Sequence, residues 1–164
     1  MNPKSTAQVA GHPFHPMLIP FPIAFLVGTF LTDIAYRGTG DPFWAGVSYW
    51  LLAAALVMAG LAASAGFIDF LSDRLIRAQR AAWYHMVGNV TAVVLSLVNF
   101  FLRYSNGETG AYPGVMWLSL IVVLLLLFNG WKGWELVYRH RVGVLDDPEA
   151  ARTARSPAGP RRAA

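Results

Sequence analysis

The chain has 164 residues, of which 55% are hydrophobic and only 13% are charged, and its formal net charge is +4. This balance excludes an ordinary soluble domain and is typical of an integral membrane protein. Cysteine is absent, which rules out disulfides and thiolate metal ligands. The basic excess lies mainly in the expected loops and the tail and carries no nucleic-acid motif, so we expect no nucleic-acid partner.

Four apolar stretches are long enough to cross a hydrocarbon core, which needs roughly 20 such residues per helix. They are predicted at about residues 16–36, 44–70, 81–103 and 113–138. Their short connections predict an all-α fold, an integral membrane four-helix antiparallel bundle in contact with the lipid bilayer. Residues 1–15 form an N-terminal arm and residues 16–140 the membrane domain. Residues 141–164 are a basic tail whose Ala, Arg and Pro content predicts disorder.

The distribution of basic residues predicts how the bundle is oriented. Of the 13 Lys and Arg residues, only Arg37 and Arg103 fall in the loops after the first and third helices. The others lie in the arm, the second loop and the C-terminal region, so the positive-inside rule places both termini in the cytoplasm. The first span is too long for the apolar core of a signal peptide, and we expect it to be retained.

Helical spacing predicts which side chains face the interior. One stripe on the third helix combines polar and small residues: His85, Asn89, Ala92, Ser96, Asn99 and Arg103. A stripe on the second helix has small residues and ends in an acid: Ala55, Ala59, Ala62, Gly66 and Asp69. Polar side chains in membrane spans turn towards protein. The small residues indicate either close helix packing or room for a flat cofactor.

Ligand-type side chains gather at one predicted end of the bundle, near the cytoplasmic face: His12, His15, His85, His140, Asp69 and Glu135. His12 and His15 each precede a proline, which disfavours helical backbone. Three residues apart in a polyproline-like arm, they are predicted to point to the same side. Asp33 lies alone at the opposite end, on one helix face with Thr29.

One hypothesis for this cluster is a single b-type haem. His85 and either His15 or His12 would be its axial ligands, because haem iron accepts imidazole on both faces. The groups predicted to orient these ligands are Asp69, Glu135, Asn89 and His140. The role would be electron transfer or redox sensing, with a redox or membrane-complex protein as partner. Because all the histidines lie at one end, a two-haem carrier across the bilayer is not expected.

Three other interpretations stay open. A non-haem transition metal would use His12, His15 and His85, although no Glu-x-x-His motif supports it. A cofactor-free structural or assembly subunit would use the same histidines only to join helices. A proton or ion path would run between Asp33 with Asn99 and the histidine cluster. Enzyme motifs are absent from the sequence, which favours a non-enzymatic role, and small-residue helix faces are compatible with a homo-oligomer.

Several segments together resemble a known bacterial family. They are the run from His12 to Ile19 continued by Phe21-Pro22-Ile23-Ala24, the segment Ala65 to Asp69, His85 with Asn89, and the segment Gly130 to His140. The chain resembles, over roughly residues 11–145, the bacterial membrane proteins catalogued as domain of unknown function 2231. The resemblance implies a four-helix domain of the bacterial cytoplasmic membrane, attached to electron-transfer modules in some relatives, with no established activity. Pro20 stands where the family often has another histidine.

Overall fold

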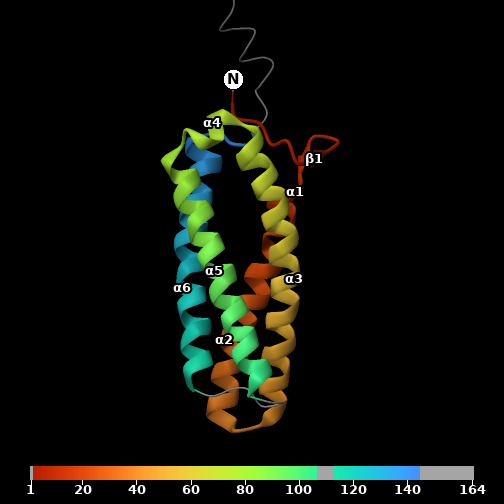
Figure 1. Ribbon diagram of the computed structural model, residues 1–164, viewed down its shortest axis with the longest axis vertical. Helices are drawn as coiled ribbons and strands as arrows, with labels where there is room; N and C mark the ends of the chain where they lie inside the picture. The colour runs from red at the N-terminus through yellow and green to blue at the C-terminus, as the bar shows by residue number, and fades with distance from the viewer. Residues whose placement is uncertain (1, 107–112, 145–164) are drawn as a thin grey trace, which may run out of the picture.

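The computed structural model describes residues 2–106 and 113–144 and consists of long helices packed side by side (Figure 1). The elements are β1 (Gln8–Val9), β2 (His12–Pro13), α1 (Phe14–Leu18), α2 (Pro20–Thr39), α3 (Pro42–Ser72), α4 (Arg74–Arg77), α5 (Arg80–Ser105), α6 (Pro113–Trp134) and η1, a π-helix (Glu135–Arg139). Residues 145–164 of the predicted tail and residues 107–112 of the predicted third loop lie outside the described residues. The predicted all-α antiparallel bundle is confirmed.

Four helices of the described part are long and apolar enough to cross a membrane: Phe14–Thr39, Pro42–Ser72, Arg80–Ser105 and Gly114–Arg139. These helices extend beyond the limits predicted from hydropathy, except at the start of the fourth. The first is locally interrupted at Ile19, since Pro20 has no N–H to donate. The protein is therefore a multi-pass membrane protein whose exposed apolar side chains contact the lipid bilayer.

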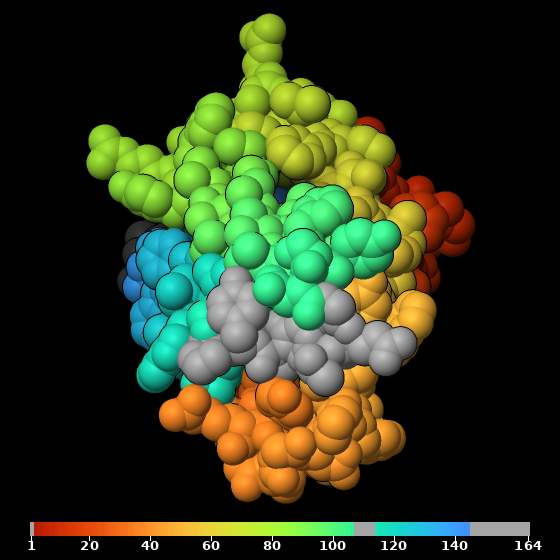
Figure 2. Space-filling view, turned by 60° about the horizontal axis from the view of Figure 1, so that its bottom comes forward, coloured from red at the N-terminus to blue at the C-terminus, as the bar shows by residue number. Residues whose placement is uncertain are grey.

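The turn between α2 and α3 is specified locally. Gly40 ends α2 with φ of 68°, a left-handed conformation that suits glycine, and its N–H donates to the Tyr36 carbonyl. Asp41 then caps α3 by accepting from the Phe43 N–H at 2.9 Å, and Pro42 takes the first helical position. We call this the far end of the bundle, where the orange turn between α2 and α3 lies in front in Figure 2.

The opposite end, which we call the terminal end, is where the two terminal segments meet. The Gly143 N–H donates to the Pro3 carbonyl at 2.9 Å, and the Asn2 side-chain amide donates to the Val144 carbonyl at 3.2 Å. The short helix α4 crosses between α3 and α5 at this end (Figure 1). Both terminal segments therefore lie at the end that carries His15 and His85.

Candidate functional site

His15 is positioned by a backbone carbonyl of α3. Its Nδ1 lies 2.7 Å from the Ala62 carbonyl oxygen, which only accepts, so Nδ1 carries the hydrogen. Gly66, one turn after Ala62, makes this approach possible. A Cβ at that position would lie 2.9 Å from Nδ1 and Cε1 of the His15 ring. In the neutral ring Nε2 then keeps a free lone pair.

His85 is held in the same way by α6. Its Nδ1 lies 3.0 Å from the Asn129 carbonyl oxygen. Gly133 again follows one turn later, and a Cβ there would lie 3.1 Å from Cε1 of His85. Both imidazoles are thus oriented in the same way, with Nδ1 donating to a backbone carbonyl that is accessible because a glycine follows it four residues later.

The two rings lie beside each other. Their centroids are 6.2 Å apart and their planes cross at 89°, and both side chains are half-buried. Two imidazoles on opposite sides of one metal atom, with metal–nitrogen distances of about 2.0–2.1 Å, have centroids about 6 Å apart. The separation of His15 and His85 is comparable. These are the two predicted site residues that the fold brings together.

The other two histidines are elsewhere. His12 lies in β2, is exposed, and its Nδ1 contacts the nearby Ala10 carbonyl at 3.0 Å. The chain is helical from Phe14 onward, so the polyproline-like arm expected to align His12 with His15 does not form. His140 follows η1, and its backbone N–H donates to the Glu135 carbonyl at 3.2 Å.

Asp69 anchors the N-terminal arm. Its carboxylate accepts from the backbone N–H groups of Thr6 and Ala7 at 2.6 and 2.7 Å and from the Ser5 hydroxyl at 2.8 Å. Asp73 does the same for the Lys4 N–H at 2.9 Å. Asp69 therefore binds the segment that leads to His15, and within residues 2–106 and 113–144 its carboxylate has no hydrogen bond to a histidine ring.

Glu135 pairs with the basic residues on either side of it, Lys132 at 2.9 Å and Arg139 at 3.6 Å. Asn89 reaches the site only through Asn129. The Asn89 side-chain oxygen accepts from the Asn129 side-chain amide at 3.2 Å, while the backbone carbonyl of Asn129 accepts from His85. Within the described residues, no group of three or more His, Asp or Glu side chains could hold a metal ion.

A second polar cluster lies near the far end and joins all four long helices. Arg103 donates to Asp33 at 2.7 Å, and both side chains are 2% exposed. Ser119 donates to Asp33 at 2.7 Å, and Ser48 donates to its other oxygen. Arg103 also donates to Ser48 at 2.9 Å and to Asn99 at 2.8 Å. The expectation that Asp33 lies alone is wrong, since it forms a buried ion pair with Arg103. Arg103 lies in the last turn of α5 and faces inward, as the predicted stripe requires, and not in the loop to which the count of basic residues assigns it.

Replacing Gly66 with alanine is expected to displace the His15 ring and break its bond to Ala62. We expect destabilisation of about 1–3 kcal/mol, the usual cost of overpacking. Gly60→Ala in the same helix is the matched control, because a Cβ there meets nothing within 4 Å. It should be neutral or stabilising by up to about 1 kcal/mol. Thermal unfolding in detergent compares the two. Equal midpoints would contradict the proposed contact.

The chain matches the family model described as predicted membrane protein (DUF2231) over residues 11–146. No curated protein and no solved structure matches it. The match begins just before His12 and ends just beyond the described C-terminal segment. It therefore spans both histidines of the pair, their glycines and the buried ion pair. The protein belongs to the membrane-protein family known as domain of unknown function 2231.

Proposed function

We propose that this protein binds one b-type haem between His15 and His85 and serves one-electron transfer or redox sensing at one membrane face. The observation that carries the proposal is that the two imidazole rings are hydrogen-bonded in the same way. Both Nδ1 atoms face backbone carbonyls, so both Nε2 atoms are the nitrogens free to ligate. A haem bound by two imidazoles would supply a one-electron iron couple.

The protein's contribution is to orient and tune these ligands. A histidine whose Nδ1–H donates to a carbonyl is held in one tautomer and is a more basic ligand through Nε2. The Ala62 and Asn129 carbonyls fill this role, and Gly66 and Gly133 give the rings access to them. Two nitrogen ligands are enough for haem, whereas a non-haem metal ion usually needs three or four protein ligands.

The membrane face follows from the positive-inside rule. Three basic residues of the described part, Arg74, Arg77 and Arg80, lie at or beside the crossing helix α4 of the terminal end. With this end in the cytoplasm, the histidine pair lies near the cytoplasmic boundary of the bilayer. An electron donor or acceptor would then approach from that side, either as a protein or as a quinone in the adjacent leaflet.

A cofactor-free structural subunit is the second candidate. The observation that favours it is that each histidine bond already joins two helices, His15 linking α1 to α3 and His85 linking α5 to α6. Interhelical hydrogen bonds in membrane proteins contribute about 0.6 kcal/mol on average. Under this alternative the histidines matter for assembly alone, and the protein would retain no cofactor.

The cofactor content of the purified protein separates these candidates. The full chain would be produced with haem supplied, purified in detergent, and measured by acid extraction of haem together with elemental analysis for iron, zinc, copper and manganese. We expect about one haem per chain, with matching iron, as two axial imidazoles require. A stoichiometric metal without haem would favour the non-haem site. Absence of both haem and metal would favour the structural subunit.

A further inference from the structure

We infer that the bundle consists of two equivalent hairpins packed about a pseudo-two-fold axis, and that the Asp33–Arg103 pair makes these unlike hairpins select each other. Hairpin 1 is residues 14–72 and hairpin 2 is residues 80–139. The inference rests on burial and spacing and does not depend on a bound cofactor.

The first helices of the two hairpins bury the same positions. Counted from His15, the buried residues of α2 follow at 7, 11, 14 and 18 positions: Pro22, Leu26, Thr29 and Asp33. Counted from His85, α5 buries residues at the same four distances: Ala92, Ser96, Asn99 and Arg103. The side chains differ at every one of these four positions, so the repeat is one of geometry.

The second helices repeat in the same way when counted back from the glycine beneath each histidine. The buried positions 18, 14, 11 and 4 residues before Gly66 are Ser48, Leu52, Ala55 and Ala62. Those before Gly133 are Val115, Ser119, Val122 and Asn129. In both hairpins the histidine bonds to the carbonyl four residues before its glycine.

Contacts between equivalent residues locate the axis. In a two-fold arrangement a residue meets its own equivalent only beside the axis. The His15 and His85 rings meet at the terminal end, and Asp33 meets Arg103 near the far end. Between the hairpins, α2 packs on α6 and α3 packs on α5. A two-fold rotation that places α2 on α5 and α3 on α6 turns each of these contacts into the other.

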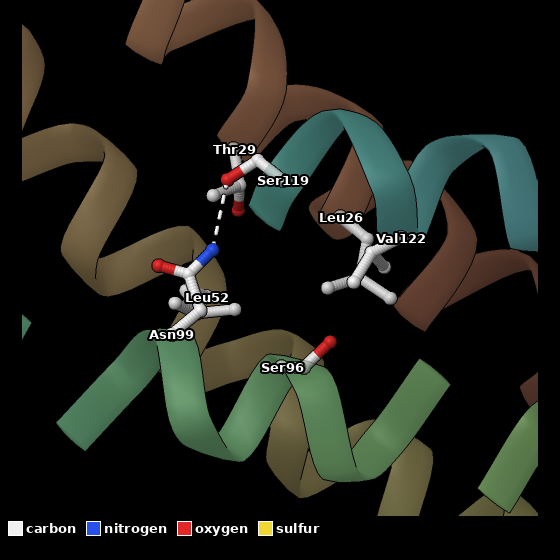
Figure 3. A pocket seen from close by; sticks show the side chains of 7 residues that line it. All are labelled: Leu26, Thr29, Leu52, Ser96, Asn99, Ser119 and Val122. Atoms are coloured by element: carbon white, nitrogen blue, oxygen red, sulfur yellow. Dashed lines mark hydrogen bonds between the residues drawn. The ribbon is translucent and has the colours of Figure 1, made fainter. Parts of the chain in front are cut away.

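A narrow gap between these two contacts, too small to hold a water molecule, also lies on the axis. Seven residues line it, among them three equivalent pairs (Figure 3): Leu26 with Ser96, Thr29 with Asn99, and Leu52 with Ser119. The Ser96 hydroxyl points from α5 into the space in front of Val122, and it is buried without a partner in the described structure. The axis thus runs through the bundle from one end to the other.

The charges explain why hairpin 1 pairs with hairpin 2. Two copies of hairpin 1 would bring two aspartates together on the axis, and two copies of hairpin 2 would bring two arginines together. Like charges buried inside the bundle are strongly disfavoured, whereas the unlike charges form an ion pair that also bonds to Ser48 and Ser119. Such a repulsive element against wrong partners is a known route to specificity.

The test exchanges the charges in the full chain. Asp33→Arg and Arg103→Asp alone create like-charge pairs, and each should shift the equilibrium towards the unfolded state by at least about 100-fold. The double exchange should recover most of that loss and exceed the neutral reference Asp33→Asn with Arg103→Gln. In the wild-type protein the amide of Asn99, four residues before Arg103, accepts a hydrogen bond from it. A second form of the exchange therefore adds Thr29→Asn and Asn99→Thr, so that the exchanged arginine at position 33 again has an asparagine four residues before it.

Unfolding by sodium dodecyl sulfate from mild detergent, followed by circular dichroism, would measure these variants. Recovery of stability in either form of the exchange supports the inference that the two charges make the unlike hairpins pair about the axis. Exchanged proteins that are no more stable than the single variants, or no more stable than the neutral reference, would overturn it. In that case the ion pair would depend on its local surroundings and not on equivalent positions.

Discussion

Replacing Arg103 with methionine is expected to lower the free energy of unfolding by about 3–5 kcal/mol, the cost of leaving one member of a buried ion pair without its partner. Asp33 is 2% exposed and would retain only hydroxyl donors, chiefly Ser48 and Ser119. A lone carboxylate in the interior of a membrane bundle is poorly solvated, so the bundle should loosen or the carboxylate should take up a proton.

The same substitution at Arg37 is the matched control, because that arginine is exposed in the last turn of α2 at the same end. Exposed positions usually change stability by less than about 0.5 kcal/mol. A double variant, Asp33→Leu with Arg103→Met, should recover part of the loss, since removing both charges also removes the unpaired one. Unfolding of the detergent-purified variants provides the measurement. Equal stability of Arg103→Met and Arg37→Met would contradict the role of the ion pair.

Replacing His15 or His85 with alanine is expected to weaken haem retention by more than about 100-fold. Loss of a group that only orients a ligand already costs about 10–100-fold in metal-site affinity, and loss of the ligand itself should exceed this. His12→Ala and His140→Ala should retain haem, because neither ring takes part in the contact between His15 and His85. Haem bound per chain after gel filtration would measure the difference. Uniform retention across all four variants would contradict ligation by His15 and His85.

The four helices and the inward stripe of the third helix could be predicted because hydropathy and helical periodicity are direct properties of the residue order. Ala92, Ser96, Asn99 and Arg103 are buried as that stripe requires. Hydropathy predicts limits that are mostly too short, because charged and small residues near the ends lower the hydropathy while the backbone stays helical. Arg103 stands at the predicted limit of the third helix, and its position in the last turn lets the side chain reach inward.

The way in which the histidines are held could not be predicted from residue types. Backbone carbonyls exist at every position, and only the fold reveals that Ala62 and Asn129 face the imidazoles. A weak signal was present, because Gly66 and Gly133 each stand four residues after the carbonyl in question. The sequence predicts that Asp69 orients a histidine, whereas its carboxylate accepts from the backbone N–H groups of Thr6 and Ala7, which residue types do not reveal.

The spacing of charges held a further signal. Asp33 follows His15 by 18 residues, and Arg103 follows His85 by the same 18. Such an equality has meaning only once His15 and His85 are known to be neighbours, since it then places the two charges beside each other as well. The equivalent buried residues differ in type at each of the four positions, so similarity of sequence does not reveal the two hairpins.

The central claim, that His15 and His85 hold a haem, is tested most directly by the absorption spectrum of the haem-supplied protein, oxidised and then reduced with dithionite. The wild-type protein and His12→Ala should show a Soret band with sharp α and β bands on reduction, the pattern of iron with two imidazole ligands. His85→Ala should lose those bands. A wild-type spectrum without haem bands, or bands that persist in His85→Ala, would contradict the account.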